Sequence, residues 1–186
     1  MFVMPLVLAA AIQQQVLLPP PPRTHLEAML LQAGAVVVQG SSLAGFVRGL
    51  DGTGVGVRAL EVTDTASGSK EYGFSIDVRQ PVEHAAARAA IAYVDYDEIA
   101  PMLAALDRLI AMNSTVTRLD RFEGDYRTAG DLRVSVFSTR DGVFAAVAAG
   151  GAPLEPLATA SFHIADLQLL RNLVAQGKAT IDTARQ

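Results

Sequence analysis

Two kinds of hydrophobic spacing alternate along the chain from residue 35 onward. Segments 55–62, 72–78 and 132–136 alternate apolar and polar side chains, the pattern of a strand with one buried face. Further strand-like segments are 43–50, 87–94, 116–126, 143–149 and 157–162. Apolar residues recur at helical spacing in 99–110 and again in 164–174, each time after a strand-rich block. The pattern predicts strands followed by a helix, repeated once.

Turn and cap signals mark the ends of these segments. The dipeptide Asp51-Gly52 and the segment 140–142 are tight-turn sequences. Asp95 is placed to cap the first long helix, and Gly177 to end the second. The spacing of Thr24 and Glu27 is that of a capping box and predicts a short helix over 26–33.

The two blocks also align with each other. Placing Ile99 on Leu167 matches apolar residues throughout the two helices, and it puts His163 in the place of Asp95, a capping or hinge position. We therefore expect an α+β fold made of two successive antiparallel units of four strands and one helix. The helices would pack on the sheets. The single domain would span 23–186, with halves at about 35–112 and 116–177, preceded by a leader and a short helix.

This order of elements resembles the whirly-type fold of single-stranded nucleic-acid-binding regulators, over residues 35–176. The resemblance lies in element order alone, so no residue takes a role from the family. It implies, as one alternative, a protein that binds single-stranded nucleic acid.

Residues 1–22 have a composition of their own. An apolar run over 2–12 ends in small residues and is followed by the prolines of 19–22. The run is shorter than the roughly 20 residues of a membrane span and suits the apolar region of a signal peptide, although no basic residue precedes it. We expect a signal-peptide-like leader with a proline-rich spacer, export to the periplasm or outside the cell, and no stable membrane span after processing. An apolar arm that packs on the domain or on a partner is the alternative.

Composition narrows the classes of function. Hydrophobic residues make up 51% of the chain and charged residues 18%, which excludes intrinsic disorder. The chain has no cysteine, so thiolate metal sites and thiol catalysis are excluded. No Walker or dinucleotide-binding sequence occurs, and we expect no cofactor.

The segment 118–140 interleaves arginines with aromatic residues, as a surface for single strands would. Its five arginines are balanced by four acidic residues within the segment and by Asp141 directly after it, and the formal net charge of the whole chain is −4. Phosphate binding is therefore disfavoured, and nucleic acid is an unexpected partner. The segment remains our candidate surface for a ligand or a protein partner, with residues Arg118, Arg121, Phe122, Tyr126, Arg127 and Arg133.

Other candidate sites have simpler explanations. Asp95, Asp97 and Glu98 are weak candidates for metal binding, because carboxylates at a helix N-terminus usually serve as caps. The segment 40–44 loosely resembles a nucleophile elbow around Ser42, with His84 or His163 as a base, but we expect a hairpin turn there. A serine hydrolase is the least favoured hypothesis for the function.

Taken together, these features predict a non-enzymatic, exported protein with a binding or structural role. Its partner would be a protein or a small ligand in the cell envelope. Exposed edge strands of such sheets favour pairing, so we also expect a homo-oligomer.

Overall fold

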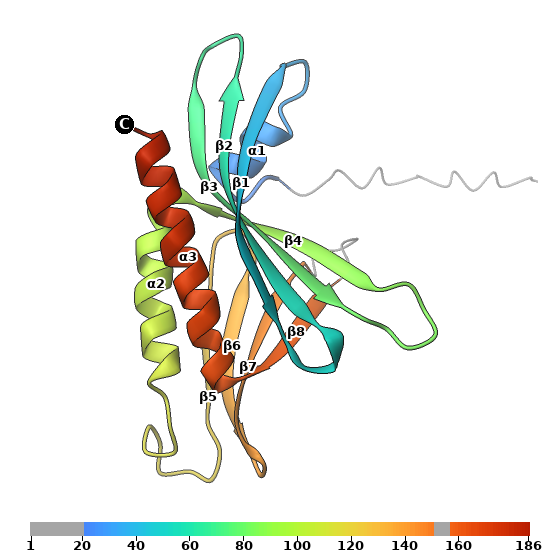
Figure 1. Ribbon diagram of the computed structural model, residues 1–186, viewed down its shortest axis with the longest axis vertical. Helices are drawn as coiled ribbons and strands as arrows, with labels where there is room; N and C mark the ends of the chain where they lie inside the picture. Colours follow the sequence, from blue (N-terminus) through green and yellow to red (C-terminus); the bar gives the residue numbers. More distant parts are fainter. Residues whose placement is uncertain (1–20, 151–156) are drawn as a thin grey trace, which may run out of the picture.

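The computed structural model describes residues 21–150 and 157–186 and has an α+β fold (Figure 1). The predicted fold class is confirmed: four strands and a helix are followed by four more strands and a helix. The elements are α1 His25–Leu30, β1 Val37–Arg48, η1 Leu50–Gly52, β2 Gly54–Asp64, β3 Lys70–Gln80, β4 Arg88–Asp95, α2 Tyr96–Ile110, β5 Glu123–Arg127, β6 Arg133–Thr139, β7 Gly142–Ala149, β8 Ala158–His163 and α3 Ile164–Ala184. Most of the leader predicted over 1–22 and most of the loop after Gly150 lie outside the described residues.

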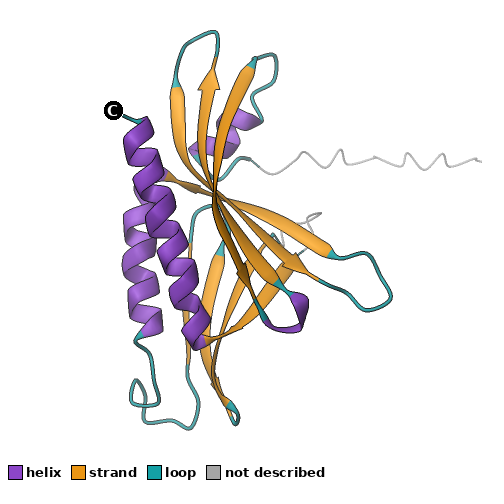
Figure 2. Ribbon diagram, in the orientation of Figure 1, coloured by secondary structure: helices purple, strands orange, loops and turns teal. Residues whose placement is uncertain are grey.

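The strands form two antiparallel sheets (Figure 2), and within each sheet the strands follow the order of the sequence. Sheet A contains β1-β2-β3-β4, and sheet B contains β5-β6-β7-β8. The tight turn predicted at Asp51-Gly52 links β1 to β2, with both residues at positive φ. The predicted turn at 140–142 is also present, since Thr139 pairs directly with Gly142.

One hydrophobic core joins both units. Helix α3 belongs to the second unit but packs on sheet A, where Leu173 lies against Gly45. Helix α2 belongs to the first unit and touches sheet B, where its end places Met112 against Gly124. The two helices also lie side by side (Figure 1). Each unit thus needs the other to cover its apolar face.

Three sequence predictions on element boundaries are wrong. The segment 40–42 is no hairpin turn: β1 continues through it, because Gly40 pairs with Glu61 on β2. The strand predicted over 116–126 shrinks to β5, and the chain between α2 and β5 has no regular structure. Helix α3 does not end at Gly177, which is buried where the helix crosses the Phe74 ring. A Cβ there would lie 2.6 Å from Phe74 Cε1, so glycine serves close packing.

The N-terminal helix is held by a cap from outside its own segment. Asp95 takes the N-cap position of α2 as predicted, but its side chain makes no cap hydrogen bond to that helix. Its carboxylate instead accepts hydrogen bonds from the backbone N–H groups of His25 at 2.7 Å and Leu26 at 3.1 Å, at the start of α1. Thr24 Oγ1 accepts from Glu27 N, as the capping box requires, whereas the Glu27 carboxylate accepts from Arg23 N.

The residues that the alignment of the two halves matches can be compared for burial. The matched apolar residues are all buried, and they are Val94, Ile99, Met102, Leu106, Phe162, Leu167, Leu170 and Val174. Asp95 and His163 occupy equivalent N-cap positions with nearly the same backbone angles.

Candidate functional site

The outer face of sheet A, opposite α3, is only partly covered by the rest of the chain. Helix α1 packs on one end of this face, where Leu26 lies against Gly73 and both are buried. Beyond α1, strand alternation brings three cross-strand rows of side chains to the outer face. From β1 to β4, the rows are Leu43, Arg58, Ser75 and Tyr93; Phe46, Gly56, Asp77 and Ile91; and Arg48, Gly54, Arg79 and Ala89. We call these twelve positions the outer patch.

Exposed apolar side chains lie at both edges of the outer patch. Leu43 is 63% exposed and Phe46 47% on β1, and Ile91 is 54% exposed on β4. An isolated exposed apolar residue is ordinary, but several on one sheet face indicate a contact surface.

The Phe46 ring lies over the neighbouring strand because two glycines leave room for it. A Cβ on Gly54 would lie 2.7 Å from Phe46 Cε1, and a Cβ on Gly56 would lie 3.5 Å from Phe46 Cδ2. The two glycines are two residues apart on β2, so the ring spans both. The glycines of the 52–56 segment therefore create a half-exposed aromatic surface, in addition to their role at the turn.

Positive charge gathers on the outer patch although the chain as a whole is acidic. Arg48, Arg58 and Arg79 belong to the patch, with Asp77 as its one acidic residue. Arg79 donates two hydrogen bonds to Asp77 Oδ2, at 3.0 and 2.6 Å. The twelve positions thus carry a local excess of positive charge, which a net charge per segment does not show.

A groove of about 730 Å³ opens between α1 and the β3–β4 side of the outer patch. This volume is within the range of small-molecule binding sites. Leu30 of α1 and Leu31, the residue that caps this helix, form one wall, and Ala89 and Ile91 of β4 form the other. The polar lining includes Glu27, Asp77, Arg79 and Arg88.

Tyr93 and Arg88 are two groove side chains that could bind a polar group of a ligand. Burial raises the pKa of the Tyr93 hydroxyl, and the nearby Glu27 carboxylate adds to that rise. Tyr93 is therefore a neutral hydroxyl at physiological pH, able to donate a hydrogen bond. Arg88 is exposed and takes part in none of the ion pairs found within 21–150 and 157–186. The groove thus combines apolar walls with a hydroxyl and a guanidinium.

The candidate residues from the sequence are divided among three places. Arg118 and Arg121 lie in the connection between α2 and β5. Phe122 and Tyr126 pack against the core, and burial followed by the nearby Glu98 charge raises the pKa of Tyr126.

Arg127 and Arg133 pair across β5 and β6 and line a shallow groove on the opposite face of sheet B. Arg133 donates to Asp125 and Glu123, and its hydrogen bonds hold the pKa of Asp125 below its usual value. The rings of Phe122 and Tyr126 therefore do not share a face with these two arginines.

A row of rings on this face of sheet B was missed by the sequence analysis. The ring centroids of Phe137 and Phe144 are 6.4 Å apart, and those of Phe144 and His163 are 5.4 Å apart. The sequence could have predicted the first of these two contacts, since the two-residue turn after Thr139 places Phe137 opposite Phe144. The position of His163 depends on the pairing of β7 with β8, which no turn sequence fixes.

Two of the three weak metal candidates accept hydrogen bonds from the backbone of other segments. Asp95 caps α1, and Glu98 Oε1 accepts a hydrogen bond from Ala129 N at 2.8 Å. Asp97 is exposed in the first turn of α2. Within the parts of the chain that the structure describes, no group of three or more acidic or histidine side chains is placed to hold a metal ion.

Ser42 does not have the geometry of a nucleophile elbow. It lies inside β1, paired with Ala59, and not at a turn between a strand and a helix. His84 lies in the β3–β4 connection, and His163 ends β8. The shallow groove beside Ser42 has no histidine among the residues that line it.

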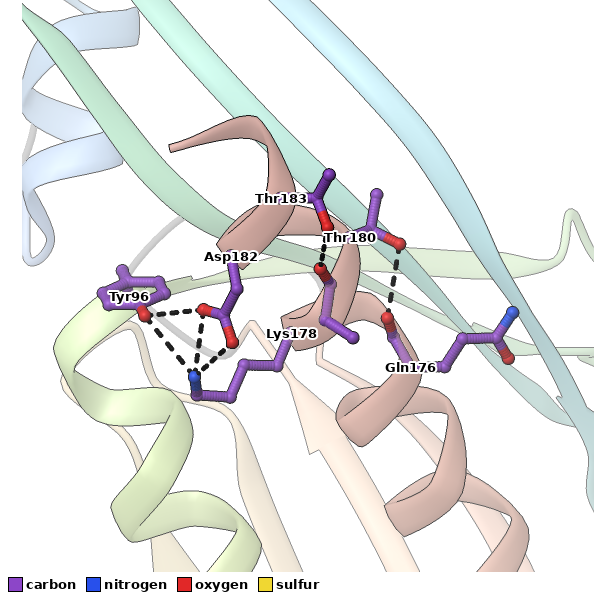
Figure 3. A network of polar contacts seen from close by, with 7 residues as sticks. Tyr96, Gln176, Lys178, Thr180, Asp182 and Thr183 are labelled. Atoms are coloured by element: carbon purple, nitrogen blue, oxygen red, sulfur yellow. Dashed lines mark hydrogen bonds and ion pairs between the residues drawn. The ribbon is translucent and has the colours of Figure 1, made fainter. Parts of the chain in front are cut away.

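A polar network joins the start of α2 to the end of α3 (Figure 3). The Tyr96 hydroxyl donates to Asp182 Oδ1 at 2.6 Å, and Lys178 Nζ donates to both carboxylate oxygens. These bonds raise the pKa of Lys178 and lower that of Asp182. The Arg185 guanidinium lies 3.8 Å from the Tyr96 ring centroid. Because the groups satisfy one another, the network serves as a clamp between the helices.

Comparison with known proteins identifies no family. The sequence matches no family model, and no curated protein or solved structure gives a significant match. In the described part of the chain, none of the helices is long and apolar enough to span a membrane.

Proposed function

We propose that this protein is an exported, non-enzymatic binding protein whose ligand occupies the groove between α1 and the outer patch. The observation that carries the proposal is the groove itself: 730 Å³, apolar on two walls, with a few polar groups beside them. A concave, mostly apolar site with a small number of polar groups is the usual form of a ligand site.

The lining favours an amphiphilic anion as the ligand. Leu31 and Ile91 are 70% and 54% exposed, and both would lose that exposure against an apolar chain. Arg88, at the start of β4, offers a guanidinium for a carboxylate, and the Tyr93 hydroxyl offers a separate donor five residues further along the strand. The carboxylates of Glu27 and Asp77 also line the groove, and they disfavour a ligand with more than one negative charge. A single carboxylate on an apolar body fits this arrangement best.

Titration with dodecanoate tests the proposal directly. The full chain should bind it, and Ile91→Asp should weaken binding about tenfold or more, since burying an aliphatic side chain contributes about 1.5–3 kcal/mol. Leu169→Asp is the matched control, because Leu169 is also 54% exposed but lies on α3. Arg88→Gln should weaken binding of dodecanoate and leave binding of dodecanol unchanged. Equal binding by Ile91→Asp and the control would refute the site.

Export rests on the apolar segment over 2–12 and the small residues that end it. Cells expressing the full gene with a C-terminal tag should yield a processed chain outside the cytoplasm. N-terminal mass analysis should place its first residue between 12 and 24. An intact cytoplasmic chain would contradict export, and the apolar segment would then be an arm of the folded protein.

A second candidate function is binding of single-stranded nucleic acid, which the Phe46 ring favours. Single strands bind to aromatic rings flanked by positive charge, and Arg48 and Arg58 flank this ring on β1 and β2. Anisotropy of a labelled oligothymidylate should then show binding that weakens steeply with salt and is lost in Phe46→Ala. Absence of binding at low salt would exclude this function while leaving the groove proposal intact.

A further inference from the structure

The four edge strands of the two sheets differ in how their free edges are protected. The edge of β8 is covered, since the N–H groups of Thr159 and Ser161 donate to the side chains of Gln80 in β3 and of Thr53, the residue before β2. The edge of β4 is covered at Tyr93, whose carbonyl lies against Gly130. The third edge strand, β5, has only five residues, three of them charged. Short strands, charges and covering segments are the usual protection against edge pairing.

Strand β1 has little of this protection. It is twelve residues long, the longest strand described, and Arg48 at its end is its one charged residue. It pairs with β2 alone, so its other edge has no partner strand in the described fold. A bulge between Leu43 and Gly45 interrupts the second part of the strand. The segment 37–43 before the bulge is regular, and it contains no proline and no charge.

The sequence of 37–43 complements itself when two copies run antiparallel around Gly40. Val37 then lies opposite Leu43 of the second copy on the outer face, at both ends of the pairing. Val38 lies opposite Ser42 on the inner face, and Gln39 lies opposite Ser41 on the outer face. Every cross-strand pair therefore joins residues of the same face, and no like charges meet.

A groove lies over the inner face of sheet A next to this edge. A shallow groove of about 270 Å³ lies between β1 and the last turns of α3. Thr180, Ile181 and Ala184 line it from the helix, and Gly40 and Ser42 line it from the strand. Val38 is 55% exposed on the same face. A second β1 would bring its own Val38 to the α3 side of the sheet, where that apolar side chain loses contact with water.

We propose that segment 37–43 of β1 pairs antiparallel with the same segment of a second copy of this chain, around a two-fold axis at Gly40. The two copies of sheet A then form one continuous sheet of eight strands. The surface is distinct from the ligand groove, which lies across the sheet at β4. A test of the dimer can therefore fail without affecting the ligand proposal, and the reverse is also true.

Sedimentation equilibrium of the full chain across micromolar concentrations tests the dimer. The expected mass is twice the 19.6 kDa of one chain. Gln39→Lys with Ser41→Lys places lysines opposite each other on both sides of the axis, so the dimer dissociation constant should rise about tenfold at low salt. Both positions are exposed, so the folded monomer should be unaffected. Gln168→Lys with Asn172→Lys adds the same charge on the exposed side of α3 and should leave the dimer intact.

Complementation separates edge pairing from a general effect of charge. A chain with Gln39→Glu and Ser41→Glu should self-associate as weakly as the lysine variant, and a mixture of the two variants should form a tighter heterodimer. Recovery of the heterodimer supports the proposed register. A monomer at every concentration, or a dimer that the lysine variant does not weaken, would overturn the proposal.

Discussion

Asp95→Ala should destabilise the fold through a helix that is distant from it in sequence. Asp95 is 8% exposed, and its carboxylate accepts hydrogen bonds from two N–H groups at the start of α1, those of His25 and Leu26. Hydrogen bonds to a charged group contribute about 1.5–3 kcal/mol, and loss of an N-cap costs about 0.5–2 kcal/mol. We expect the free energy of unfolding to fall by about 2–3 kcal/mol. For a chain of this size, that corresponds to roughly 5–10 °C in Tm.

Urea unfolding followed by circular dichroism measures this loss of stability. Two further variants serve as controls. Asp97→Ala removes an exposed carboxylate from the first turn of α2, so it should cost only the helix-dipole contribution of about 0.3–1 kcal/mol. Asp95→Asn keeps one acceptor oxygen and should fall between the two alanine variants. If Asp95→Ala cost no more than Asp97→Ala, Asp95 would be an ordinary cap of α2 and the reasoning would be refuted.

Three further predictions concern packing, the helix clamp and pH. Gly73→Ala should lower the free energy of unfolding by about 1–3 kcal/mol in the same urea assay, because a Cβ there would overlap the Val94 carbonyl. Tyr96→Phe should cost about 0.5–1.5 kcal/mol, since it removes the hydroxyl that joins α2 to α3. The hydrogen bonds from Arg171 hold the pKa of Asp107 below its usual value, so this contribution is present above about pH 4 and is lost as the pH falls further. Urea midpoints should therefore fall less between pH 5 and pH 3 in Asp107→Asn than in the unchanged chain.

The α+β class follows from the sequence because periodicity is a local property. Alternation over 72–78 and helical spacing over 99–110 each depend on one segment and on the face it buries. The failures occur where a distant segment decides the outcome. Gly40 and Ser42 resemble turn residues, yet pairing with β2 keeps them in a strand. Gly177 resembles a helix end, yet it lies inside α3 because the helix must pass close to Phe74.

In the connection before β5, exposed apolar residues gave rise to a wrong strand prediction. Val116 and Leu119 contributed to the strand predicted over 116–126, but they are 52% and 77% exposed. The core of sheet B instead takes Phe122 and Tyr126, which directs their rings away from Arg127 and Arg133. Whether an aromatic residue faces the core or the solvent depends on register, and register was not fixed for this segment.

The candidate groove could not be predicted from the sequence pattern. Alternation alone places Arg58 on the same face as Gly54 and Gly56, because the three residues occupy every second position of β2. It does not say which face of the sheet stays open. That depends on α1 and α3, which come from opposite ends of the described chain and cover opposite faces of sheet A. The net charge of a half chain sums both faces with the loops, so it hides a basic, partly apolar patch on an acidic protein. A ligand meets one face at a time, and the charge that decides binding is therefore the charge of that face.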